Sequence, residues 1–123
     1  MSASFDSAVF VPDGLLAGNA GLLVGEKVTI ITGQNLVRGA VIGKITAGGK
    51  YNLSLSGAAD GSQTPDLILA EDCDATGGDK EAMAFSRGDF NQNKLTLGAA
   101  HTVASIKEGL RVKGITLVNS VGA

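Results

Sequence analysis

The fold is decided by the stretch Pro12–Ser56, PDGLLAGNAGLLVGEKVTIITGQNLVRGAVIGKITAGGKYNLSLS. Within it, β-branched and apolar residues alternate with polar ones, and glycines interrupt the series at short intervals. Alternation with a period of two, bounded by Gly, Asn and Lys, is typical of β-strands joined by tight turns. We therefore expect strands at Lys27–Thr32, Arg38–Thr46 and Tyr51–Ser56, with turns at Gly33–Asn35 and Gly48–Gly49.

The chain beyond this stretch continues as strands and loops. Ala58–Pro65 is a loop by composition, with Asp60-Gly61 as a turn signal. A short apolar run at Leu95–Leu97 follows a polar stretch. The remaining candidate strands are Asp66–Glu71 and Glu81–Arg87, separated by the acidic loop DCDATGGDK, and a last strand at Ile115–Val118.

One helix is predicted near the C-terminus. Thr102 can cap its start, and Gly114 can end it. Apolar residues at helical spacing and basic residues toward the negative end of the dipole support the assignment: Val103, Ile106 and Leu110, and Lys107, Arg111 and Lys113. Gly109 lies inside this helix at a cost of about 1 kcal/mol relative to Ala. We therefore expect close packing at Gly109, against the sheet or a neighbouring subunit.

Composition places the chain among small proteins without a charged binding surface. Its 123 residues predict one domain, and 44% are hydrophobic, but only 4% are aromatic. Glycine, at 18 residues, is about twice its usual share of ~7%. The net charge is −2 and the basic residues are scattered, which argues against nucleic-acid binding.

The sequence also bears on the compartment. No apolar stretch approaches the ~20 residues of a membrane span, and the first residues do not form a signal peptide. The single cysteine, Cys73, excludes an intrachain disulfide and is typical of a reducing compartment such as cytoplasm. We expect no membrane partner.

Residues Met1 to about Leu23 differ from the rest of the chain. Their apolar side chains follow neither a helical nor a strand period, and Pro12 and Gly14 interrupt them further. Such a segment cannot bury its own apolar groups, so we expect a flexible arm over residues 1–23 and a β-rich core over residues 24–123. The arm residues that can be buried against a partner are Phe5, Val9, Phe10, Val11, Pro12, Leu15 and Leu16.

No catalytic, metal or cofactor site is predicted. His101 precedes the helix and is expected to help cap it, and the acidic neighbours of Cys73 make its thiol a poor nucleophile. The acids Glu71, Asp72, Asp74 and Asp79 lack the spacing of an EF-hand, which favours a solvated acidic loop. TAGGK and TGGDK lack the continuation of a P-loop.

Four blocks of sequence, in order, resemble the head decoration proteins of bacteriophages. They are PDGLLAG (Pro12–Gly18), VTIITGQNLVRGAVIGKITAGGKY (Val28–Tyr51), ADGSQTPDLILAEDCDATGGDKEAMAFSRGDFN (Ala59–Asn91) and LTLGAAHTVASIKEGLRVKGI (Leu95–Ile115). The resemblance implies a mainly β (α+β), β-clip-like fold with one short helix near the C-terminus.

The same resemblance implies a function and partners. It implies homotrimers on the outer surface of the expanded head, which they stabilise against the pressure of packaged DNA. The arm would order on binding and pair with the major capsid protein. The protein would then lie in the host cytoplasm before assembly and on the virion afterwards; the sequence assigns no residues to the trimer interface.

Two alternatives belong to other classes of protein. A small β-barrel module for a sugar or peptide, part of a larger complex, would need an exposed aromatic platform. Tyr51 and four Phe residues offer little material for one. An enzyme is disfavoured because the chain has one histidine and one cysteine.

Overall fold

The computed structural model describes residues 15–16 and 23–119. The strands in this part of the chain are β1 (Val24–Ile30), β2 (Asn35–Leu36), β3 (Val41–Lys44), β4 (Tyr51–Leu53), β5 (Pro65–Leu69), β6 (Cys73–Asp74), β7 (Lys80–Asn91) and β8 (Ile115–Val118). The helical elements are a 3-10 turn, η2 (Gln92–Lys94), and α2 (Val103–Lys113). The predicted mainly β fold with one short helix near the C-terminus is confirmed.

The main sheet closes on itself. Its strand order is β1-β4-β3-β5-β7-β8, and β1 also pairs with β7, so the strands from β1 to β7 form a barrel-like ring. The long strand β7 makes this closure possible because it changes partners along its length. Its first part pairs antiparallel with β1 and β5, and its last residues, Gly88–Asn91, pair parallel with β8.

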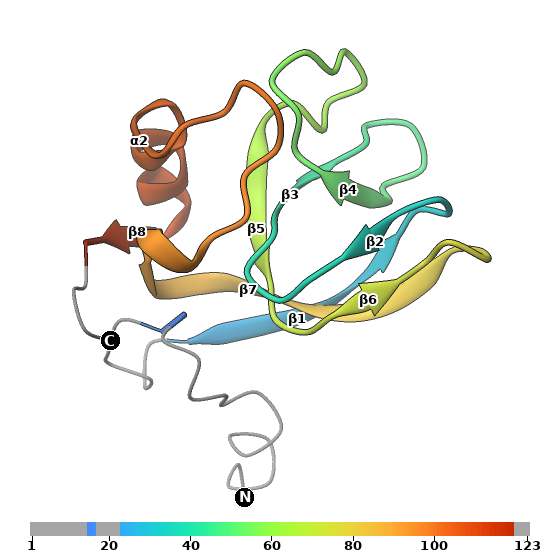
Figure 1. Cartoon of the computed structure of the whole chain (residues 1–123), viewed down its shortest axis with the longest axis horizontal. Helices are drawn as coiled ribbons and strands as arrows, with labels where there is room; N and C mark the ends of the chain where they lie inside the picture. The colour runs from blue at the N-terminus through green and yellow to red at the C-terminus, as the bar shows by residue number, and fades with distance from the viewer. Residues whose placement is uncertain (1–14, 17–22, 120–123) are drawn as a thin grey trace, which may run out of the picture.

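Two hydrophobic clusters lie on the two faces of this ring. Side chains from every ring strand make up the first cluster, including Val28, Ile42 and Leu67. Their sequence neighbours Val41 and Ile68 belong to the second cluster, beneath α2. Successive strand residues point to opposite faces, so β3 and β5 are buried on both sides. Figure 1 shows α2 and the short β2–β6 pair on opposite sides of the molecule.

The predicted strands are found with changed limits. The pattern predicted Arg38–Thr46 and Tyr51–Ser56, whereas β3 and β4 are shorter; past β4 the chain bonds instead to the segment before α2, through Ser56 N and Ala99 O (3.2 Å). β7 continues past the expected end at Arg87 because β8 pairs with its extension. The strands β2 and β6 fall where a turn and a loop were expected, and they pair with each other.

The helix α2 has the predicted ends. The Thr102 hydroxyl accepts a hydrogen bond from Ser105 N, the Ser105 hydroxyl accepts one from Thr102 N, and Gly114 ends the helix in a left-handed conformation with φ 100°. Ile106 and Leu110 are buried, as their spacing predicted. Gly109, in contrast, has nothing within 4 Å of where a Cβ would lie, so the expected packing against the sheet is wrong. No helix in residues 15–16 and 23–119 has the length and apolarity to cross a bilayer.

Candidate functional site

The described ends of the chain meet at the last residues of β7. Leu16 forms an antiparallel bridge with Phe90, and Asn91 N donates a hydrogen bond to Leu15 O (2.7 Å). Phe90 also pairs with Leu117 of β8 on the other side. Leu15 and Val118, which pairs with Asn91, therefore lie at one common end of the barrel.

Polar side chains hold this end together. Asn91 is buried, and its side-chain oxygen accepts a hydrogen bond from Asn93 N (3.1 Å), which caps η2. Asn93 Nδ2 in turn donates to Asn119 Oδ1 (2.7 Å), the last residue that the structure describes. A buried amide whose oxygen is hydrogen-bonded helps to fix the local backbone at this end of the barrel.

The structure places two of the predicted arm residues within the barrel. Leu15 is 1% exposed and belongs to the cluster beneath α2, and Leu16 packs against that cluster. Leu15 is therefore packed within this chain, and its contact with a partner stays a prediction. The sequence did not reveal this packing, since a two-residue bridge is too short to show a period. The other predicted arm residues, Phe5, Val9, Phe10, Val11 and Pro12, lie outside the described residues.

An unpaired strand edge lies beside this end. β8 is the last strand in the sheet order and pairs with β7 on one side only, within the described part of the chain. No strand of the described residues pairs with its far side, and an edge of this kind can be extended by another chain through main-chain hydrogen bonds. Ile115 and Leu117 of β8 are buried in the cluster beneath α2, and this burial anchors the strand.

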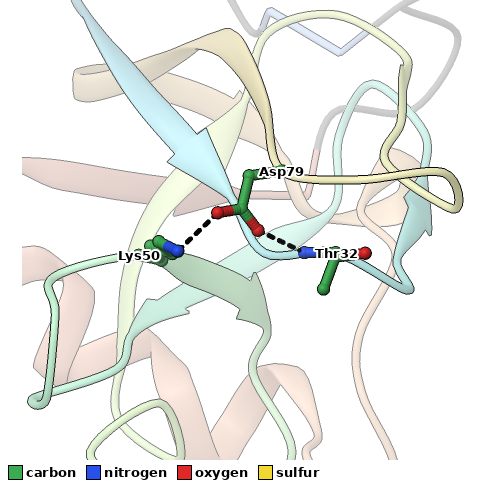
Figure 2. A network of polar contacts seen from close by, with 3 residues as sticks. All are labelled: Thr32, Lys50 and Asp79. Atoms are coloured by element: carbon green, nitrogen blue, oxygen red, sulfur yellow. Dashed lines mark hydrogen bonds and ion pairs between the residues drawn. The ribbon is translucent and has the colours of Figure 1, made fainter.

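The carboxylates in and beside the acidic loop accept hydrogen bonds from distant parts of the chain. Asp79 accepts hydrogen bonds from Thr32 N (2.8 Å) and from the Lys50 ammonium, so it joins three separate segments (Figure 2). These two bonds lower the pKa of Asp79, the Lys50 bond contributing most. Asp72 accepts from Arg38 N (2.8 Å), and Glu71 accepts from Met83 N (2.7 Å). No group of three metal-ligating side chains occurs in the described residues.

Cys73 is enclosed in the core. Its side chain is 1% exposed and packs in the cluster inside the ring. Burial raises the pKa of the Cys73 thiol most, and the charges of Glu71 and Asp74 raise it further, while Lys80 lowers it. The predicted direction is confirmed, but burial contributes more than the acidic neighbours from which it was inferred.

His101 does not cap the helix, because the capping bonds come from Thr102 and Ser105. Its Nε2 atom lies 3.1 Å from Ser54 Oγ and 3.1 Å from Gln63 O, so it joins the strand end after β4 to the loop before β5. A carbonyl oxygen only accepts, so Nε2 carries the proton in this contact and cannot take one from Ser54. Ser54 is also fully buried, which leaves no room for a substrate.

The aromatic side chains offer no platform for a ligand. Tyr51, Phe85 and Phe90, the aromatics within the described residues, are all buried. The closed sheet is compatible with the small-module alternative, but the exposed aromatic face that it requires is not found in this part of the chain.

Comparison with known proteins identifies the family. A search of curated proteins found no match. The sequence model of the family described as bacteriophage lambda head decoration protein D matches residues 5–114, which includes most of the predicted arm and nearly all of the barrel. Decoration of the head is a structural role on the virion capsid and not a catalytic one. The chain belongs to the bacteriophage lambda head decoration protein D family.

Proposed function

We propose that this protein attaches as a homotrimer to the outer surface of the expanded phage head and stabilises the shell against the pressure of packaged DNA. The observation that carries the proposal is the family match over residues 5–114, which begins within the predicted arm. Before assembly, the protein would lie in the host cytoplasm.

The position of Leu15 and Leu16 supports separate roles for the two parts of the chain, attachment for the first residues and folding for the barrel. In the sequence, residues 1–14 precede Leu15 and Leu16, which bond to Asn91 and bridge to Phe90, respectively. We propose that the apolar side chains of these first residues contact the major capsid protein. An arm that extends a strand edge of the capsid protein gains main-chain hydrogen bonds without a specific pocket.

Trimer formation would convert weak arms into tight attachment. Burying one large apolar side chain is worth roughly 1.5–3 kcal/mol, and ordering the backbone costs about 1–2 kcal/mol per residue. One arm therefore binds weakly, whereas linked arms on one rigid body act at high effective concentration.

Two measurements test the proposal. Sedimentation at micromolar concentration should give the mass of three chains, and a stable monomer would contradict the homotrimer. Mixing the protein with expanded, undecorated heads should give saturable binding in multiples of three copies. Decorated heads should also retain their DNA at temperatures that empty undecorated ones. Heads that take up no protein would overturn the proposed role.

A further inference from the structure

A polar pocket of about 350 Å³ opens on the surface of the barrel. It lies between the end of β3, the loop before β5, the start of β5 and the last residue of α2. Its lining residues are Lys44, Thr46, Gly61, Thr64, Asp66 and Lys113. The volume falls in the range of pockets that hold a small ligand or a partner's side chain.

The charges in this pocket leave one lysine unneutralised. Both oxygens of Asp66 accept a hydrogen bond: Oδ1 from Lys113 Nζ (3.0 Å) and Oδ2 from the Tyr51 hydroxyl (3.0 Å). Burial and the bond to Asp66 raise the pKa of Tyr51, so the phenol stays a donor. Lys44 has no acidic partner among the described residues, and the pocket carries a net positive charge.

The walls of the pocket are preformed. Asp60 Oδ1 accepts from both Ser62 N (3.0 Å) and Ser62 Oγ (2.6 Å), and Asp60 O accepts from Thr46 N (2.8 Å). At Gly61, which has φ 104°, a Cβ would lie 2.2 Å from Thr46 Oγ1, so only glycine allows this wall. The hydroxyls of Thr46 and Thr64 make no hydrogen bond within the described part of the chain.

We propose that this pocket binds the carboxylate of an acidic side chain on the surface of the phage head, an inference that rests on the proposed function. An ammonium and two hydroxyl donors match the charge and the acceptor capacity of one carboxylate. A ligand with one negative charge also balances the pocket, whereas a phosphate group would leave excess negative charge beside Asp66. Contact here would add to that of the arm.

The first test compares Lys44→Gln with Lys107→Gln. Both variants remove one exposed positive charge, but Lys107 lies on α2 outside the pocket. Binding to expanded, undecorated heads is measured at low and moderate salt. Lys44→Gln should weaken binding about two- to fivefold per site, with a smaller salt dependence. Lys107→Gln should bind as the wild type does. If the wild type binds heads and Lys44→Gln binds equally well, the inferred carboxylate site is wrong. The proposed decoration role is then unaffected.

A second test needs no heads. In the wild type, sodium acetate should shift the amide NMR signals of Thr46, Gly61 and Thr64 saturably, and sodium chloride at equal ionic strength should not. Lys44→Gln should abolish these shifts; absence of acetate shifts in the wild type overturns the carboxylate site. If the wild-type protein fails to bind heads, the proposed function is wrong, and so is the phage head as the source of the carboxylate. The acetate titration then tests only whether the pocket binds a carboxylate.

Discussion

At the scale of single residues, one glycine is tightly packed and another is in open space. A Cβ at Gly43 would lie 2.1 Å from the carbonyl oxygen of Ser62, whereas at Gly109 nothing lies within 4 Å. Gly43→Ala should lower the free energy of unfolding by about 3 kcal/mol, because the loop must move off β3. Gly109→Ala should raise it by about 1 kcal/mol. Denaturant unfolding at equal protein concentration checks both. Destabilisation by Gly109→Ala would show that a neighbouring subunit covers this face.

The buried thiol of Cys73 leads to a second prediction. Cys73→Ser places a hydroxyl without a designed partner in the core, which should lower the free energy of unfolding by about 1–3 kcal/mol. Binding to heads should not change, since Cys73 faces the inside of the ring. A folded variant that no longer binds would contradict the structural role. Reaction of the native thiol with a disulfide reagent should also be slow until the protein unfolds.

At the scale of elements, hydrogen-bonded carboxylates fix the loops: Asp60 and Asp74 bond within their own turns, and Asp79 joins separate segments. Asp60, Asp74 and Asp79 each accept hydrogen bonds that lower their pKa in the folded protein. A lowered pKa adds stability above the unfolded value of about 3.9, and this stability is lost as the pH falls through the folded pKa. The protein should therefore become less stable below about pH 4.

Asp79→Asn isolates one of these contributions. The variant loses the ion pair with Lys50 and should unfold at lower denaturant concentration than the wild type at pH 7. The difference between the two proteins should shrink as the pH falls through the folded pKa of Asp79, because protonation then removes the ion pair from the wild type as well. Asp89→Asn, which removes a carboxylate without a described partner, serves as the control and should change little. A difference that persists undiminished at pH 2 would contradict the assignment.

Some of these strands and helices could be predicted from the sequence, and others could not. The helix was predictable to its end residues because Thr102 and Gly114 are local signals, as was the alternation in β1 and β4. The extension of β7 past Gly88 depends on β8, which lies far along the chain. The β2–β6 pair has two residues in each strand, too few for a period. Of the candidate site, only the apolar arm could be predicted, because its apolar residues lack a helical or strand period. The contacts of Leu15 with Asn91, of Leu16 with Phe90 and of Lys113 with Asp66 exist only in three dimensions.

At the scale of the whole molecule, the barrel holds the chain at Leu15–Leu16, directly after the proposed arm residues. The ring fixes β7, and β7 holds Leu15–Leu16 on one side and β8 on the other. Because Leu15 is part of the core, a truncation intended to remove only the arm must end before it. A deletion through Leu16 would remove a buried side chain and confuse loss of folding with loss of attachment.

Attachment through the residues before the barrel is tested most directly by deleting residues 2–13 and measuring binding to expanded, undecorated heads. Circular dichroism and sedimentation should show an unchanged fold and trimer mass, since Leu15 is retained. A full-length variant with Phe5→Ser, Val9→Ser and Phe10→Ser serves as a length-matched control and should fail in the same way. We predict that both proteins lose attachment or bind at least about 100-fold more weakly, because the apolar contacts of every arm are removed together. Undiminished binding by the truncated protein would contradict this mechanism and place the contact on the folded barrel.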